Sequence, residues 1–212
     1  MYPNIKNDEC LICFEKLQHG MDILQFFYYE DVICCQCRRE ILFQKQKIKI
    51  GEFEIDSLYL YEGTIRNLML QYKELYDEAL APVFLYPKYK EIRKKYADYV
   101  LVPIPSSISK VEERGFHHVE SMFSLLNLPI YNVFEKKGNR QQKELGVRER
   151  NLISFQLSNT EMLSGRKVLL IDDVMTTGNS MIHAYQLIQG FVEEVKGLTV
   201  CIHKKLLRKE DL

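Results

Sequence analysis

Runs of apolar residues along the chain mark the strands of a buried sheet. Residues 99–105 are apolar throughout and 167–171 almost so; prolines end the first run and a pair of acids ends the second. Apolar runs that stop at a turn signal are typical of strands buried on both faces of a parallel sheet. Together with shorter or alternating patterns, they predict strands at residues 55–61, 99–105, 131–134, 167–171 and 195–202.

Helical spacing of apolar residues fills the segments between these strands. In residues 64–76, Ile65, Leu68, Met69 and Tyr72 recur at the period of a helix face. Similar patterns predict helices at residues 83–96 with an interruption near Pro87, at 110–126 and at 181–191. Strands that alternate with helices favour a parallel α/β sheet. The polar, poorly periodic residues 136–151 indicate a mobile loop.

Composition is that of a soluble globular protein. The 212 residues are 46% hydrophobic and 27% charged, enough for one sizeable core and a small appendage. A formal net charge of zero excludes a global basic field for nucleic acid. No apolar stretch approaches transmembrane length, and residues 1–10 lack the apolar segment of a signal peptide. We therefore expect a cytoplasmic protein with reduced thiols and no membrane insertion.

Most of the six cysteines are clustered near the N-terminus. Cys10 and Cys13 form one Cys-x-x-Cys knuckle, and Cys34 and Cys37 form a second. Two such knuckles favour a tetrahedral zinc site, and four thiolates leave no open coordination position, so the role of the zinc is structural. Cys35 is either a bystander or an alternative ligand. A redox pair or scattered free thiols is the other interpretation of the cluster.

The most specific pattern is VLLIDDVMTTGNS at residues 168–180. A buried strand runs into Asp172 and Asp173, and a Thr/Gly/Ser loop follows before a helical pattern. Ligands of open α/β sheets bind at the carboxyl ends of strands. The loop can wrap an anion with hydroxyls and with backbone N–H groups at a helix N-terminus, and the two carboxylates can accept hydrogen bonds from vicinal hydroxyls. This combination indicates a ribose 5-phosphate site; the alternative is a buried strand that ends in a solvated turn.

This segment resembles the phosphoribosyl pyrophosphate (PRPP) signature of type I phosphoribosyltransferases. The resemblance implies an α/β fold whose open, mostly parallel sheet carries helices on both faces. It also implies that the loop holds the 5-phosphate of PRPP and that the acid pair holds the ribose, partly through Mg²⁺. The PRPP-binding residues carried over are Asp172, Asp173, Val174, Met175, Thr176, Thr177, Gly178, Asn179 and Ser180.

Further motifs resemble the ComF competence-protein family, in which zinc knuckles precede a phosphoribosyltransferase-like domain. Residues 61–73 resemble its Tyr-x-Gly-x-x-Arg-x-Leu-x-x-x-x-Lys segment, and residues 102–105 resemble its Val-Pro-Val-Pro strand end. Residues 114–116 resemble the start of its Arg-Gly-Phe-Asn-Gln element, and 142–151 its Gln-x-x-Leu and Glu-Arg loop. The resemblance predicts a Cys₄ zinc-finger-like module at residues 1–50 and a phosphoribosyltransferase-like domain at 51–212.

Two departures from the family pattern concern the pyrophosphate region. His117 and His118 stand where the family usually has Asn-Gln, and a partly exposed helical pair is their simplest interpretation. Asn151 follows Arg150 without the usual spacer. The resemblance still implies a pyrophosphate loop after an early core strand and a flexible loop that closes over the reaction. The candidates for these two loops are Pro105, Ser106, Ser107, Arg114, Arg148 and Arg150.

The sequence assigns no catalytic residue. Thr176 occupies a position that purine-salvage members fill with an acidic general base, and a threonine cannot serve in that way. No C-terminal hood for a nucleobase is evident, because only one strand and a basic tail follow the signature helix.

The resemblance implies a ComF-like competence factor that handles internalised single-stranded DNA in the cytoplasm. DNA-uptake helicase or recombination proteins are its expected partners. Basic runs at residues 88–95 and 136–150, with Tyr86, Tyr89 and Tyr96 beside the first, permit backbone contact and base stacking. Solvated charges and core tyrosines are the plainer interpretation of the same residues. The alternative functions are an active phosphoribosyltransferase in nucleotide salvage or synthesis and a non-catalytic PRPP-sensing regulator.

Overall fold

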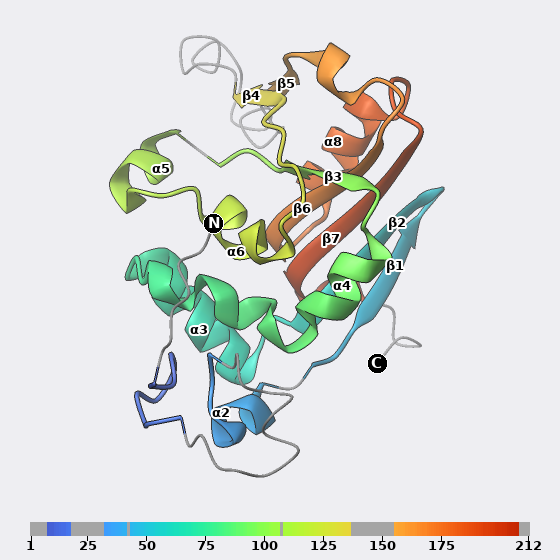
Figure 1. Ribbon diagram of the computed structural model, residues 1–212. Helices are drawn as coiled ribbons and strands as arrows, with labels where there is room; N and C mark the ends of the chain where they lie inside the picture. The colour runs from blue at the N-terminus through green and yellow to red at the C-terminus, as the bar shows by residue number, and fades with distance from the viewer. Residues whose placement is uncertain (1–7, 18–31, 42, 107, 137–154, 208–212) are drawn as a thin grey trace.

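The computed structural model of the chain describes residues 8–17, 32–41, 43–106, 108–136 and 155–207 (Figure 1). Several sequence predictions lie outside these residues. They are the mobile loop after Lys136 with the motif at residues 142–151, and the candidates Ser107, Arg148 and Arg150.

The centre of the fold is a five-stranded sheet in the order β1-β2-β7-β6-β3. Its strands are β1 (Gln46–Ile50), β2 (Phe53–Leu60), β3 (Tyr99–Pro103), β6 (Lys167–Met175) and β7 (Glu194–Ile202). The β2–β7, β7–β6 and β6–β3 pairs are parallel, and β1 alone pairs antiparallel to its neighbour. The open, mostly parallel sheet predicted from the sequence is therefore confirmed.

Helices cover both faces of this sheet (Figure 1). On one face lie α3 (Gly63–Glu74), α4 (Tyr89–Lys95) and α6 (His118–Phe123), and on the other lies α8 (Asn179–Ile188). The alternation of side chains along β6 produces the two cores, because successive strand residues face opposite sides. Leu169 and Ile171 belong to the cluster with α3, α4 and α6, whereas Val168 and Leu170 belong to the cluster with α8.

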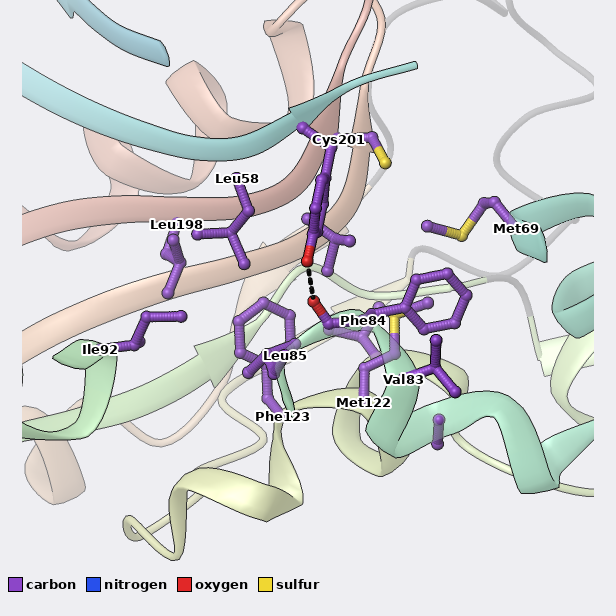
Figure 2. Packing of buried hydrophobic residues seen from close by; sticks show 14 of the residues in the cluster. Leu58, Met69, Val83, Phe84, Leu85, Ile92, Met122, Phe123, Leu198 and Cys201 are labelled. Atoms are coloured by element: carbon purple, nitrogen blue, oxygen red, sulfur yellow. Dashed lines mark hydrogen bonds between the residues drawn. The ribbon is translucent and has the colours of Figure 1, made fainter. Parts of the chain in front are cut away.

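The larger core joins strands β2 and β7 to the helical layer. Figure 2 shows its side chains, among them Leu58, Leu198, Phe84 and Met122. The buried hydroxyl of Tyr59 donates a hydrogen bond of 3.0 Å to the carbonyl of Phe84, which satisfies a polar group inside an apolar cluster.

Two predicted helices are interrupted. The continuous helix predicted at residues 110–126 is wrong: α5 (Ile108–Arg114), α6 and the 3₁₀ turn Ser124–Leu126 replace it. The break falls at Gly115, whose φ of +82° lies in the left-handed region and ends the helix. Residues 83–96 break near Pro87 as predicted, into 3₁₀ turns at Glu78–Phe84 and Tyr86–Lys88 followed by α4.

A second, two-stranded sheet is formed by β4 (Phe134–Lys136) and β5 (Phe155–Leu157). The strand predicted at residues 131–134 was wrong in position. The chain before β4 runs instead along the edge of β3, where Leu101 donates to the carbonyl of Pro129 and accepts from the amide of Tyr131. Other elements that the sequence analysis did not predict are β1, α2 (Cys35–Glu40), and the 3₁₀ turns Thr160–Leu163 and Lys204–Leu206.

The cysteine-bearing segments pack on the same core as the sheet. Cys10, Ile33, Cys37 and Ile41 are buried in one cluster with Tyr59 of β2. The strand β1 precedes the predicted boundary at residue 50 and hydrogen-bonds to β2, and that boundary stays a prediction. Among the helices in the described parts of the chain, none combines the length and apolar composition needed to cross a bilayer.

Candidate ligand site and metal centre

The acid pair and loop of the signature lie toward the carboxyl end of β6, an inner strand of the sheet. Strand β6 continues to Met175, so Asp172 and Asp173 belong to the strand rather than to a turn that follows Ile171. The reason is backbone pairing with β7, in which Asp172 lies opposite Thr199 and Met175 opposite Ile202. Val174 and Met175 pack against the two cores.

The loop after β6 leads directly into the N-terminus of α8. Thr176, Thr177 and Asn179 are exposed, and Ser180 is half-buried in the first turn of the helix. Gly178 precedes the helix with a φ of +75°, a conformation that a side chain would strain. Hydroxyls beside a helix N-terminus form an arrangement that suits a phosphate group.

Asp173 is the centre of a buried polar network. Its Oδ2 lies 2.6 Å from Nζ of Lys73 in α3 and 2.6 Å from Nε2 of His118 in α6. The other ring nitrogen of His118, Nδ1, lies 2.7 Å from Nη1 of Arg114. Arg114 also donates to the carbonyl of Lys73 at 3.2 Å, and Tyr72 donates to the carbonyl of His118 at 2.7 Å. Side chains from α3 and α6 therefore contact one carboxylate of β6, and Arg114 of α5 supports both of them.

No pattern in the sequence predicted this network. His117 is exposed as expected, but His118 is 5% exposed, so the prediction of a partly exposed pair was wrong for the second histidine. The break at Gly115 is the physical reason, because it starts a new helix that turns His118 toward β6. Lys73 ends the ComF-like motif of residues 61–73, which was one signal that the sequence offered for this network.

The two carboxylates of the signature differ in their electrostatic surroundings. Burial alone would raise the pKa of Asp173, but the hydrogen bond from His118 and the charge of Lys73 outweigh it and hold the pKa below its ordinary range. Burial, together with the charge of Asp173, raises the pKa of Asp172 well above its ordinary value. An acid pair with divided pKa values is typical of functional sites.

A cavity of about 570 Å³ lies beside this network, at the carboxyl end of β3. Pro105 and Ser106, two of the pyrophosphate candidates, line it together with His118 and Phe134. The Ser106 hydroxyl is 3.5 Å from Nδ1 of His118, so the imidazole connects this segment to Asp173. Arg114, the other described candidate, is buried and engaged with His118 rather than exposed to the cavity.

The four predicted zinc ligands come together near the N-terminus. The Sγ atoms of Cys10, Cys13, Cys34 and Cys37 all lie within 4.8 Å of one another. Zn–S bonds of about 2.3 Å in a tetrahedron place sulfurs about 3.8 Å apart, and Cys13 and Cys34 are separated by 3.7 Å. Backbone amides of Ile12 and Cys34 donate to the sulfur of Cys10. The cluster can therefore hold a metal such as zinc.

Cys35 lies outside this group and is exposed. Its position in the first turn of α2, after the N-capping sulfur of Cys34, separates it from the four convergent thiols. Of the two alternatives left open by the sequence, the geometry favours the bystander.

The basic run on α4 is partly neutralised by neighbouring acids. Lys88 pairs with Glu91 at 2.8 Å, and Lys95 pairs with the buried Asp56 of β2. Lys90, Arg93 and Lys94 are exposed. Among the tyrosines, Tyr96 is 2% exposed and donates to Asp56, so it is a core residue and not a stacking platform.

Comparison with known proteins is consistent with this geometry. Residues 111–211 match the family model of the phosphoribosyl transferase domain. Competence protein ComFC of Bacillus subtilis is 30% identical over 129 residues, covering 59% of this chain and 53% of the relative. Competence protein ComFC of Streptococcus pneumoniae is 27% identical over 135 residues, with 63% and 60% covered. The chain is therefore similar to ComFC competence proteins, and its residues 111–211 are similar to a phosphoribosyl transferase domain.

The matches are partial in length. This chain spans between 53% and 60% of the two ComFC relatives. Adenine phosphoribosyltransferase of Campylobacter jejuni is 30% identical over 107 residues, covering 47% of this chain and 55% of the enzyme. A solved hypoxanthine phosphoribosyltransferase of Staphylococcus aureus aligns with a TM-score of 0.39 at 14% identity, covering 57% of this chain and 62% of that enzyme.

Proposed function

We propose that this ComFC-like protein binds PRPP with Mg²⁺ and acts in DNA uptake, handling internalised single-stranded DNA in the cytoplasm. The observation that carries the PRPP half is the loop at residues 176–180, which joins the acid pair of β6 to the N-terminus of α8. Similarity to two ComFC competence proteins supports the DNA-uptake half. Contacts with helicase or recombination proteins belong to the same proposal.

The ligand would lie across the carboxyl end of the sheet. The hydroxyls of Thr176, Thr177 and Ser180 and the first amides of α8 suit the 5-phosphate. The half-buried residue Asp172 suits the ribose hydroxyls or a hard cation such as Mg²⁺, which prefers carboxylate oxygens. When bound, Mg²⁺ would neutralise the charge of the pyrophosphate.

A second candidate is an active phosphoribosyltransferase. The intact acid pair and loop favour it, whereas Thr176 cannot act as a general base and the described residues after α8 supply only β7 and a 3₁₀ turn. Release of pyrophosphate from PRPP in the presence of nucleobase acceptors tests this candidate. PRPP binding without turnover on any acceptor favours a binding or sensing role instead.

Single-stranded DNA would meet the exposed cations of α4. Arg93 and Lys94 are exposed, and neither forms an ion pair within the described residues. Fluorescence anisotropy with a labelled oligonucleotide at several salt concentrations tests this surface. The double variant Arg93→Ala/Lys94→Ala should weaken binding and lower the salt slope by about 0.7 for each phosphate that it no longer neutralises.

The matched control removes two cations from a strand instead of from helix α4. Lys47→Ala/Lys49→Ala on the edge strand β1 changes the net charge equally and should leave the affinity for DNA nearly unchanged. Equal reductions of affinity in the two double variants would show that charge alone, and not α4, attracts DNA. Saturable PRPP binding with no DNA affinity at low salt would contradict the DNA-handling half of the proposal.

A further inference from the structure

The carboxylate of Asp173 is already occupied by donors from the protein. Lys73 and His118 both approach Oδ2 at 2.6 Å, and the amide of Val174 donates to Oδ1. The side chain is only 5% exposed. A carboxylate with both oxygens engaged and almost no exposed surface has little capacity left for the hydroxyls of a ligand.

Arg114 fixes the orientation and the tautomer of His118. A guanidinium has donors and no acceptor, so the contact of 2.7 Å between Nη1 and Nδ1 requires Nδ1 to accept. The proton of the imidazole then resides on Nε2, where it donates to Asp173. Arg114 is itself buried and tied to the carbonyl of Lys73 at 3.2 Å, so Lys73, Arg114 and His118 form one connected support.

Asp172 is the carboxylate that this support leaves available. Its Oδ1 accepts from the backbone amide of Asp173 at 2.9 Å, and within the described residues no cationic side chain pairs with it. It is also more exposed than Asp173. The two neighbouring acids therefore have opposite environments, although the signature presents them as an equivalent pair.

We propose that the two acids have different roles: Asp173 is an internal anchor held by Lys73 and His118, and Asp172 is the carboxylate that contacts the ligand. This division rests on the proposed PRPP site, whose ribose hydroxyls would meet Asp172. His118 is a positioning residue that acts through Asp173. Since Ser106 lies 3.5 Å from its Nδ1, it also ties the segment after β3 to the signature strand.

Two isosteric variants of the full chain test the division. Each is titrated with Mg²⁺ and PRPP by calorimetry and unfolded in urea. Asp172→Asn should lower PRPP affinity by on the order of 100-fold because bound Mg²⁺ and ribose hydroxyls favour the ionised carboxylate, which asparagine cannot form. Its unfolding midpoint should be unchanged or higher. Asp173→Asn should lower the unfolding midpoint clearly and reduce the affinity less. Equal effects of the two variants on both quantities would overturn the proposal.

The urea unfolding midpoints distinguish failure of this proposal from failure of the proposed PRPP site. Absence of PRPP binding by the unaltered protein would refute the proposed function, and a lower midpoint for Asp173→Asn than for Asp172→Asn would still support the anchor. Equal midpoints would refute the anchor whatever the ligand result.

A matched pair at His118 tests its positioning role. His118→Gln can place an amide N–H near the position of Nε2, whereas the shorter side chain in His118→Asn reaches only the position of Nδ1. We expect the glutamine variant to retain most of the PRPP affinity and the asparagine variant to bind about tenfold more weakly. In the unaltered protein, ¹⁵N NMR should find the imidazole proton on Nε2. A proton on Nδ1, or equal affinity of the two variants, would overturn the positioning role.

Discussion

The ammonium nitrogen of Lys73 lies 2.6 Å from Oδ2 of Asp173, and this contact joins the last turn of α3 to the signature strand β6. Lys73 is also the last residue of the ComF-like motif at residues 61–73. The contact gives that motif a physical role, because Leu68, Met69 and Tyr72 pack the helix against the sheet and thereby bring a cation to the acid pair.

Asp56 carries a stability contribution that depends on pH. It is 5% exposed and meets Lys95, Lys45 and the hydroxyl of Tyr96. Burial would raise its pKa, but these partners outweigh burial and hold the pKa below the ordinary value of 3.8. Because the folded state lowers this pKa, the stabilisation is present above the ordinary pKa and disappears as the pH falls through the folded value.

The variant Asp56→Asn should therefore lower the free energy of unfolding by about 2 kcal/mol at neutral pH. The difference between the two proteins should shrink below about pH 4, where the unfolded aspartate becomes protonated. Urea unfolding of both proteins at several pH values measures this difference in the free energy of unfolding. Acid effects that the two proteins share cancel in the difference. A difference that stays constant from pH 7 to pH 3 would contradict this account.

Gly197 permits the close approach of β7 to β2. A Cβ atom there would lie 2.9 Å from Cγ1 of Ile55 and 3.1 Å from Cζ of Phe53. Gly197→Ala should therefore destabilise the protein by about 1–3 kcal/mol through overpacking. Gly190→Ala is the control, since a Cβ atom there meets nothing within 4 Å. Thermal unfolding compares the two, and equal midpoints would contradict the packing.

The metal centre predicts a difference between neighbouring cysteines. Cys37→Ser should lose zinc and destabilise the protein, because Cys37 belongs to the four-thiol cluster and to the buried core. Cys35→Ser, two residues away and exposed, should retain zinc and stability. Metal content by mass spectrometry and the unfolding midpoint check both. Stoichiometric zinc in a folded Cys37→Ser variant would remove that residue from the ligand set.

The sequence predicted most elements that depend on local pattern and missed those that depend on tertiary contact. The apolar runs identified β3 and β7, but β6 extends through two aspartates, which have low strand propensity, because pairing with β7 holds them. The edge strand β1 alternates Lys47 and Lys49 with isoleucines. This alternation is typical of a strand, but it was missed because the segment is short and charged.

In the candidate site, too, features set by local sequence were predictable and features set by tertiary contacts were not. The signature residues follow one another in sequence, so their common location was predictable. The Lys73–Asp173–His118 contacts join three separate elements, and no local pattern encodes their convergence. The left-handed turn at Gly115, which turns His118 inward, was a local clue, since a glycine within a predicted helix marks a possible end.

The central claim is that the loop at residues 176–180 and Asp172 form a working PRPP site. Calorimetric titration of the full chain with PRPP in the presence and absence of Mg²⁺ tests it most directly. The account predicts saturable binding at one site that depends on Mg²⁺ and is nearly abolished in Asp172→Asn. Absence of binding, or binding that Asp172→Asn leaves unchanged, would contradict it.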